Sequence, residues 1–141
     1  MKIASDLIEL KTDKEIGFYD ITEKLAEKTK AAGIKNGFVI AFVQHTTAAL
    51  RVNENESKLL KDLLRVLEKI APKKEKYEHD IKTVDSRING HAHCKSLALN
   101  SSESIPIKDG KLLLGTWQSL FFIELDGPRN NRQVMLQFIG E

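Results

Sequence analysis

The sequence predicts an α+β fold: a single domain built as a mixed β-sheet or sandwich, with two main helices and one short helix. Three observations predict it. Two stretches carry apolar residues at helical spacing, most of the remaining chain reads as strands, and the two types do not alternate regularly. The length of 141 residues fits one domain over residues 1–141, since domains commonly run about 100–150 residues.

The first helix is predicted to follow Asp20. The run Asp20-Ile-Thr-Glu23 resembles a capping box, with Asp in place of the usual Ser or Thr. Apolar positions at Ile21, Leu25 and Ala32 then follow helical spacing. Gly33 is a natural left-handed end for this helix.

The second helix is predicted over Glu56–Ile70, and Pro72 stops it. Its apolar side chains share one face and its charged ones point elsewhere, as in an amphipathic helix. The apolar face consists of Leu59, Leu60, Leu63, Leu64, Leu67 and Ile70. A third, short helix is predicted over Asn89–Leu99, with Asn89 as its cap.

The strands are predicted from apolar runs bounded by turn residues. Gly37–Val43 is apolar enough to be buried on both faces. The turn Lys108-Asp-Gly-Lys111 joins two strands, because Gly110 accepts a positive φ. A C-terminal β region is predicted over Ser104–Ile107, Lys111–Leu114, Thr116–Asp126 and Arg132–Ile139.

The composition excludes several classes of protein. With 22 Lys and Arg against 20 Asp and Glu, the formal charge of +2 is too small for a nucleic-acid footprint. The lone Cys94 closes no intrachain disulfide, so a reducing compartment is the default. No signal-peptide core and no membrane-spanning run of ~20 apolar residues is found. We expect a cytoplasmic protein with no nucleic-acid and no membrane partner.

The four His are candidate metal ligands. His45, His79, His91 and His93 lie beside polar groups that can fix the tautomer of an imidazole ring. Three neutral imidazoles around an open position form the catalytic zinc arrangement. If Asn89–Leu99 is helical, His91 and His93 point about 200° apart and only one can be a ligand, for which we choose His93. If that segment is extended, both could face one metal. Each His taken singly is more often hydrogen-bonded or solvated than a ligand.

Three cationic side chains are candidates for binding an anion. Lys95 is predicted in the first turns of the third helix, where backbone N–H groups favour negative charge. Arg129 and Arg132 flank a tight turn, and guanidinium groups suit phosphate. The alternative for the two Arg is an ordinary surface role, paired with Asp126 or Glu124.

Two further segments allow both a binding and a structural role. Trp117 and Gln118 could line a pocket wall, and the alternative for Trp117 is a core aromatic. Asn53 and its neighbours Glu54 and Asn55 suit the start of the second helix, and that role alone explains them.

The chain resembles the YjbQ-like family, whose members are often labelled secondary thiamine-phosphate synthase family proteins. The resemblance covers nearly the whole chain, and Gly115-Thr-Trp-Gln118 after a Ser-x-x-Ile/Val-Pro strand pair is its most specific part. The other matching segments are Gln44-His-Thr-Thr-Ala-Ala-Leu50, Asn53-Glu-Asn55, Glu78-His-Asp80, Ala92-His93 with Lys95, Ser104-Ile-Pro-Ile107 with Gly110, and Asp126-Gly-Pro-Arg129.

The resemblance implies an α+β domain on a mixed sheet, assembled as a homotrimer. It also implies a weak ability to join hydroxymethylpyrimidine diphosphate to thiazole phosphate. Matched position by position, it implies a metal site at His45, His79 and His93, and it leaves His91 outside the pattern.

Three functions follow as hypotheses. The first is a metal-dependent enzyme, a transferase or a metal-assisted hydrolase or lyase, that acts on a small phosphorylated metabolite. Its divalent metal is zinc on the three imidazoles, or Mg²⁺ if diphosphate chemistry is real. The second is a non-catalytic trimer that binds metal or an anionic metabolite, and the third is a structural protein without metal. The sequence identifies no catalytic base, and the expected substrate-binding residues are Lys95, Arg129, Arg132, Asn53, Trp117 and Gln118.

Overall fold

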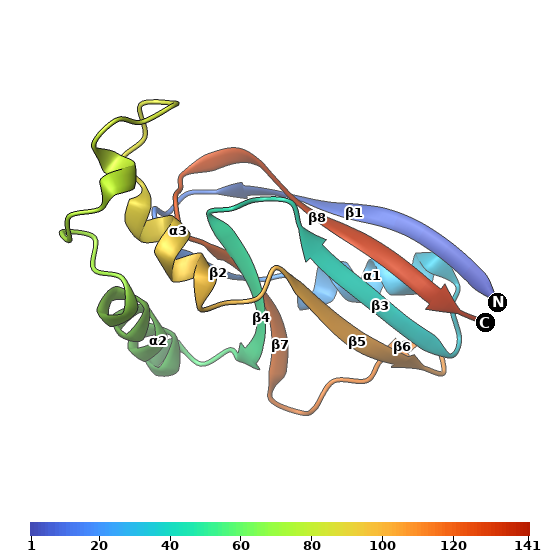
Figure 1. Cartoon of the computed structure of the whole chain (residues 1–141). Coiled ribbons are helices and arrows are strands. Elements are labelled where there is room, and N and C mark those ends of the chain that lie inside the picture. The colour runs from blue at the N-terminus through green and yellow to red at the C-terminus, as the bar shows by residue number, and fades with distance from the viewer.

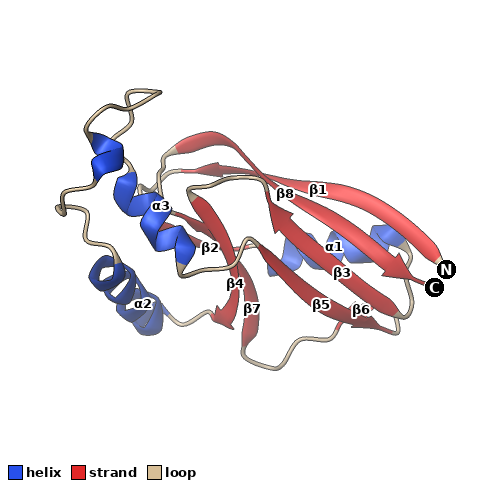
Figure 2. Cartoon of the chain, in the orientation of Figure 1, coloured by secondary structure: helices blue, strands red, loops and turns tan.

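The computed structural model describes residues 1–141 and consists of two packed β-sheets, with one helix behind the larger sheet and two helices beside the smaller one (Figures 1 and 2). The larger sheet has the order β1-β8-β3-β5-β6 and the smaller one β2-β7-β4. The strands of the larger sheet are β1 (Lys2–Thr12), β8 (Arg129–Gly140), β3 (Gly37–Val43), β5 (Ser102–Lys108) and β6 (Lys111–Leu112). Those of the smaller sheet are β2 (Gly17–Asp20), β7 (Gln118–Glu124) and β4 (Ala48–Glu54).

The predicted α+β class and sandwich are confirmed, and three α-helices accompany the strands. Every strand pair is antiparallel, so the sheets are not mixed. The hairpin between β5 and β6 turns at Asp109 and Gly110, whose φ values of 52° and 74° are those of the predicted tight turn. The strands β1, β2 and β4 were not predicted.

The first two helices lie close to their predicted bounds. Helix α1 spans Thr22–Ala32 and ends at Gly33, whose φ is 66°. Helix α2 spans Ser57–Ile70, and the carboxylate of Glu56 accepts hydrogen bonds from two backbone N–H groups of its first turn. The predicted capping box at α1 is wrong: Asp20 instead bonds the N–H and hydroxyl of Thr22.

Helix α3 spans Gly90–Leu97, and a short 3₁₀ turn, η1, spans Glu78–Asp80. Both belong to a long excursion from the end of α2 that projects beyond the sheets (Figure 1). The predicted short helix is therefore confirmed, although its cap differs from the prediction, as described below.

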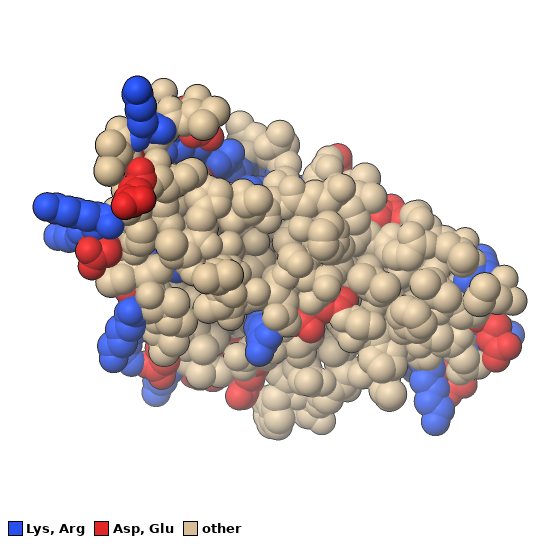
Figure 3. Space-filling view, in the orientation of Figure 1, with Lys and Arg blue, Asp and Glu red and all other residues tan.

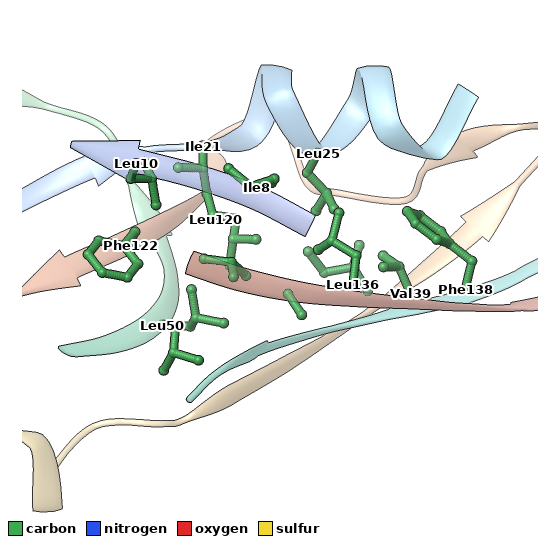
Figure 4. Packing of buried hydrophobic residues seen from close by; sticks show 14 of the residues in the cluster. Ile8, Leu10, Ile21, Leu25, Val39, Leu50, Leu120, Phe122, Leu136 and Phe138 are labelled. Carbon is green, nitrogen blue, oxygen red and sulfur yellow. The ribbon is translucent and has the colours of Figure 1, made fainter. Parts of the chain in front are cut away.

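The main core fills the space between the two sheets and under α1 (Figure 4). Ile8, Val39 and Leu136 enter it from the larger sheet, and Leu50 and Phe122 enter it from the smaller one. A second cluster lies on the other face of the smaller sheet, against α2 and α3, and comprises Ala49, Leu67, Ala92, Phe121, Ile123 and Leu125. Strand β7 is consequently buried on both faces, as its unbroken apolar run requires.

The prediction that Gly37–Val43 is buried on both faces is wrong. Val39 and Ala41 face the core, whereas Phe38 and Phe42 are 36% and 42% exposed. The reason is that α1 packs on the inner face of the larger sheet and that α2 and α3 cover the smaller sheet, so that no helix covers the outer face of β3. The cross-strand register places seven apolar side chains on this outer sheet face: Ile3, Leu7, Phe38, Ile40, Phe42, Met135 and Ile139. Figure 3 shows few charged atoms over this region.

The helices of this chain are all too short or too polar to traverse a lipid bilayer.

Candidate functional site

Apart from Lys95, the structure separates the predicted site residues into two groups at opposite ends of the β4–β7 ladder. In the register, Ala48 pairs with Glu124 at one end and Glu54 pairs with Gln118 at the other. Six residue steps at about 3.4 Å each place these ends about 20 Å apart. We call the first the histidine end, made by His45, His79, His93, Arg129 and Arg132 with their neighbours. The second is the tryptophan end, made by Asn53, Trp117 and Gln118.

Two of the three predicted ligands meet at the histidine end. The rings of His79, from η1, and His93, from α3, lie edge to face with their centroids 4.7 Å apart. Because α3 is helical, His91 points elsewhere, as predicted for that conformation. The proximity to His79 and above all partial burial lower the pKa of His93, so that its ring is neutral at pH 7.

Hydrogen bonds fix the orientation and the tautomer of His79. The amide nitrogen of Asn89 donates to Asp126 Oδ2 at 2.8 Å, which turns the amide oxygen toward His79. That oxygen lies 3.1 Å from His79 Nε2. Because an amide oxygen only accepts, Nε2 carries the proton and the lone pair of Nδ1 is free. An acceptor behind a ring N–H is the usual support of a metal-ligating His.

The start of α3 holds η1 in place. Asn89 occupies the cap position, but its side chain is used by His79 and Asp126, so the predicted side-chain cap is wrong. Asp80 replaces it: its Oδ1 accepts from the N–H of Gly90 at 2.8 Å. Gly90 is required here because a Cβ at this position would lie 2.6 Å from Tyr77 Cβ. The backbone at the start of α3 therefore packs directly against the side chains of Tyr77 and Asp80, in and beside the turn that carries His79.

Asp126 joins two arginines beside the histidine pair. Arg87 donates to it through Nε at 2.9 Å and Nη2 at 2.8 Å, and Arg129 donates through Nη2 at 2.8 Å. Burial raises the pKa of Asp126, but hydrogen bonds from Arg87, Asn89 and Arg129 outweigh it and lower that pKa to about 2. The carboxylate therefore stays ionised and orients both guanidinium groups.

Both guanidinium groups keep a free donor. Neither Nη1 atom makes a hydrogen bond within the chain, and the side chains of Arg87 and Arg129 are 35% and 29% exposed. The alternative pairing of Arg129 with Asp126 is confirmed, and it leaves this donor available. Arg87 was missed by the sequence analysis because it lies in no recognisable motif.

Arg132 has a different environment from Arg129. It is buried against the fully buried Glu124, with Nε 2.9 Å from Oε2 and Nη2 2.5 Å from Oε1. Its Nη2 also donates to the Thr47 hydroxyl at 3.0 Å. The alternative pairing with Glu124 is thus confirmed, but inside the protein rather than on its surface.

His45 lies near this pair, and its ring is hydrogen-bonded to the backbone. Its Nε2 accepts the N–H of Gln133 at 3.0 Å, so its proton is on Nδ1. Burial and the nearby Arg132 lower the pKa of His45, which keeps the ring neutral at pH 7. In this arrangement His45 presents an N–H rather than a lone pair. No group of three or more His, Cys, Asp or Glu side chains is close enough within the chain to hold a metal ion.

Lys95 lies in the last turn of α3, so its predicted place in the first turns is wrong. The helix begins only at Gly90, which makes Lys95 its sixth residue. Its ammonium is fully buried, 3.1 Å from Glu68 Oε2 and 3.1 Å from His91 Nδ1. Lys95 therefore ties α3 to α2, and no face of it is open to a ligand.

The tryptophan end is exposed. Trp117 is 73% exposed, so the alternative of a core aromatic is wrong. Gln118 accepts the N–H of Gly115 through Oε1 at 2.8 Å, which closes the loop around Trp117. Asn53 bonds the N–H of Glu54 within β4 and does not cap α2.

Comparisons with known proteins agree with this fold over almost its whole length. The family described as UPF0047 protein YjbQ-like matches residues 6–141. A UPF0047 protein of Methanothermobacter thermautotrophicus is 38% identical over 132 residues, which cover 94% of this chain and 90% of that protein. The UPF0047 protein YugU of Bacillus subtilis is 34% identical over 136 residues, which cover 94% of this chain and 97% of that protein.

Two solved structures extend the comparison. A YbjQ-like protein of unknown function from Sulfolobus solfataricus has a TM-score of 0.93 at 35% identity, with 99% of each chain covered. An uncharacterised YjbQ/UPF0047 family protein from Clostridium acetobutylicum has a TM-score of 0.86 at 38% identity, with 95% of this chain and 99% of that chain covered. The chain therefore belongs to the YjbQ-like UPF0047 family, whose function is not established in these relatives.

Proposed function

We propose that the protein is a metal-dependent enzyme that acts on a small phosphorylated metabolite at the histidine end. His79 and His93 supply the protein ligands of the metal, and Arg87 and Arg129 hold the phosphate. The observation that carries the proposal is the edge-to-face pair of imidazoles, with centroids 4.7 Å apart.

The donor chemistry supports a zinc-like ion. His79 offers the free lone pair of Nδ1, and its opposite nitrogen is held by the Asn89 and Asp126 hydrogen bonds. Imidazole nitrogen suits Zn²⁺ and related ions better than Mg²⁺. His45, predicted as the third ligand, would have to release the N–H of Gln133 before its Nε2 could bind. We therefore assign two ligands to this chain and leave the remaining positions to water, to substrate or to a neighbouring copy.

The arginine pair supports the choice of a phosphorylated substrate. The free Nη1 donors of Arg87 and Arg129 are oriented by the same carboxylate, so little side-chain freedom is lost when they bind an anion. A bound divalent metal would supply electrostatic stabilisation of negative charge on the phosphate. Of the residues proposed from the sequence, Arg132 and Lys95 do not take part, because both are buried in ion pairs.

The outer sheet face supports the homotrimer that the family resemblance implies. This face carries seven apolar side chains, of which Ile3 is 61% exposed, and no helix covers it. Obligate interfaces between subunits are apolar in this way. Light scattering should give a mass three times that of the 15.9 kDa chain.

Elemental analysis tests the metal. The purified protein should contain a zinc-like divalent metal, and His79→Ala and His93→Ala should each lose most of it while their melting curves stay cooperative. His45→Ala is the matched comparison and should keep its metal, since this His presents an N–H. Full metal content in both His79→Ala and His93→Ala would contradict the ligand assignment.

A turnover assay tests the enzyme. Hydroxymethylpyrimidine diphosphate with thiazole phosphate is the first substrate pair, with release of pyrophosphate as the readout, followed by a panel of phosphorylated metabolites. Arg87→Gln and Arg129→Gln should raise KM, and Lys28→Gln, far from the site, should not. Binding of these compounds without turnover by the metal-loaded protein would favour the non-catalytic alternative.

A further inference from the structure

A groove lies away from the histidine end, between α1 and the β5–β6 hairpin. This groove has a volume of about 740 Å³, within the range of about 300–1,000 Å³ of small-molecule sites. It is lined by Thr22, Ala26, Thr29, Lys30, Gly33, Ile34, Lys35, Asp109, Gly110, Lys111, Leu112 and Leu114. None of these residues belongs to the site proposed above.

The walls of the groove are aliphatic. Its aliphatic lining residues are Ala26 from α1, Ile34 from the following loop, Leu112 from β6 and Leu114 just after β6. No Phe, Tyr, Trp or His lines it, so it offers no surface on which a nucleobase or another flat ring would stack. Such a lining matches the shape and polarity of an alkyl chain.

The rim of the groove is cationic. Lys30, Lys35 and Lys111 line it, and none of the three forms an ion pair. Asp109 is the only acidic residue of the lining, which leaves an excess of two positive charges. An anionic group bound here would meet ammonium groups that have no other partner.

Backbone turns and a backbone hydrogen bond fix the shape of the groove. Gly33 and Gly110 turn in the left-handed region, with φ values of 66° and 74°. The N–H of Gly110 donates to the carbonyl of Lys35 at 2.9 Å, which ties the hairpin to the loop after α1. Both walls are thereby held at a set distance before any ligand arrives.

We infer that this groove binds a free aliphatic anion, with its alkyl chain against the four aliphatic residues and its acid group at the three lysines. The inference is independent of the proposed function, because it uses none of the same residues. A medium-chain carboxylate is the simplest molecule with both features.

A chain-length series tests the inference by calorimetry below the micelle concentration. Affinity should rise from hexanoate to octanoate to decanoate by up to about fourfold per added methylene. Octanol, which lacks the charge, and inorganic phosphate, which lacks the chain, should each bind more weakly than octanoate. Affinity that does not depend on chain length would overturn the aliphatic part of the inference.

Variants locate the site. Lys30→Gln and Lys111→Gln should each weaken octanoate binding about two- to fivefold, the range for an exposed charge pair. Ala26→Trp, which fills the groove, should abolish binding. Lys24→Gln is the matched control, since it changes the same helix outside the groove. Octanoate should also shift the amide resonances of Gly33 and Gly110; unchanged resonances, or equal binding by all variants, would overturn the location.

Discussion

Arg132→Met tests the buried ion pair beneath His45. The substitution keeps most of the side-chain volume but removes both guanidinium bonds to Glu124, whose carboxylate is fully buried. Removing one partner of a buried pair leaves an uncompensated charge and costs about 3–5 kcal/mol. For 141 residues, at about 2.1 cal/mol/K per residue, this free energy lowers the Tm by roughly 10–17 °C.

The assay is thermal unfolding at pH 7 and at one protein concentration, followed by circular dichroism. Lys28→Met is the matched control, because it breaks the exposed pair with Asp6, in which both side chains are 38% exposed. Exposed pairs of this kind stabilise proteins little, so the control should lose no more than about 3 °C. Adding Glu124→Gln to Arg132→Met should recover part of the loss, since no buried charge then remains.

Acidification gives an independent check of the same pair. In the wild type, burial raises the pKa of Glu124, but Arg132 and its other donors outweigh burial and hold that pKa below its usual value. The pair therefore stabilises the fold above the unfolded-state pKa and loses this contribution as the pH falls. Without Arg132, burial raises the pKa of Glu124, and protonation of Glu124 removes the unpaired buried charge. The difference in Tm between the wild type and Arg132→Met should therefore narrow toward pH 4. If Arg132→Met lowers the Tm only as much as Lys28→Met does, or by an amount that does not change with pH, the reasoning is refuted.

Three further predictions concern Asp126, Lys95 and Gly90. Asp126 has its pKa lowered from 3.8 to about 2, so its ionised form contributes about 2 kcal/mol above pH 4 that is lost as the pH falls through 2. In urea titrations from pH 5 to pH 2, the wild type should lose that much more stability than Asp126→Asn. Lys95→Met should lower stability by about 1–3 kcal/mol and leave phosphate affinity by calorimetry unchanged; weaker phosphate binding would show that Lys95 does reach the ligand. Gly90→Ala should cost about 1–3 kcal/mol, because its Cβ would meet Tyr77, and should also reduce metal content through His79; a fully stable, metal-loaded variant would contradict the packing.

The features that the sequence analysis predicted well are those with local causes. Gly33 and Pro72 end helices through their own backbone preferences, and the turn at Gly110 needs only its positive φ. The outer face of β3 could not be predicted in this way. An apolar run such as Gly37–Val43 indicates burial on both faces, but which sheet the helices cover is decided by distant parts of the chain.

The candidate site shows the same division. The separation of His91 from His93 followed from helical geometry alone. The roles of Asn89 and Arg87 depend on Asp126, which is 37 and 39 residues away. A cap position was the natural local assignment for Asn89, because nothing near it in the sequence indicates that distant partner.

Strand β8 lies between β1 and β3 in the larger sheet, yet it follows every other strand in the sequence. Its pairing joins Lys2 to Gly140 and Gly37 to Gly140. These residues are far apart in the sequence, and contacts of this kind slow folding. Because β1 pairs with β8 alone, β1 has no partner strand while the nascent chain on the ribosome still lacks β8. The larger sheet of this protein is therefore completed only after nearly all of these residues have been synthesised.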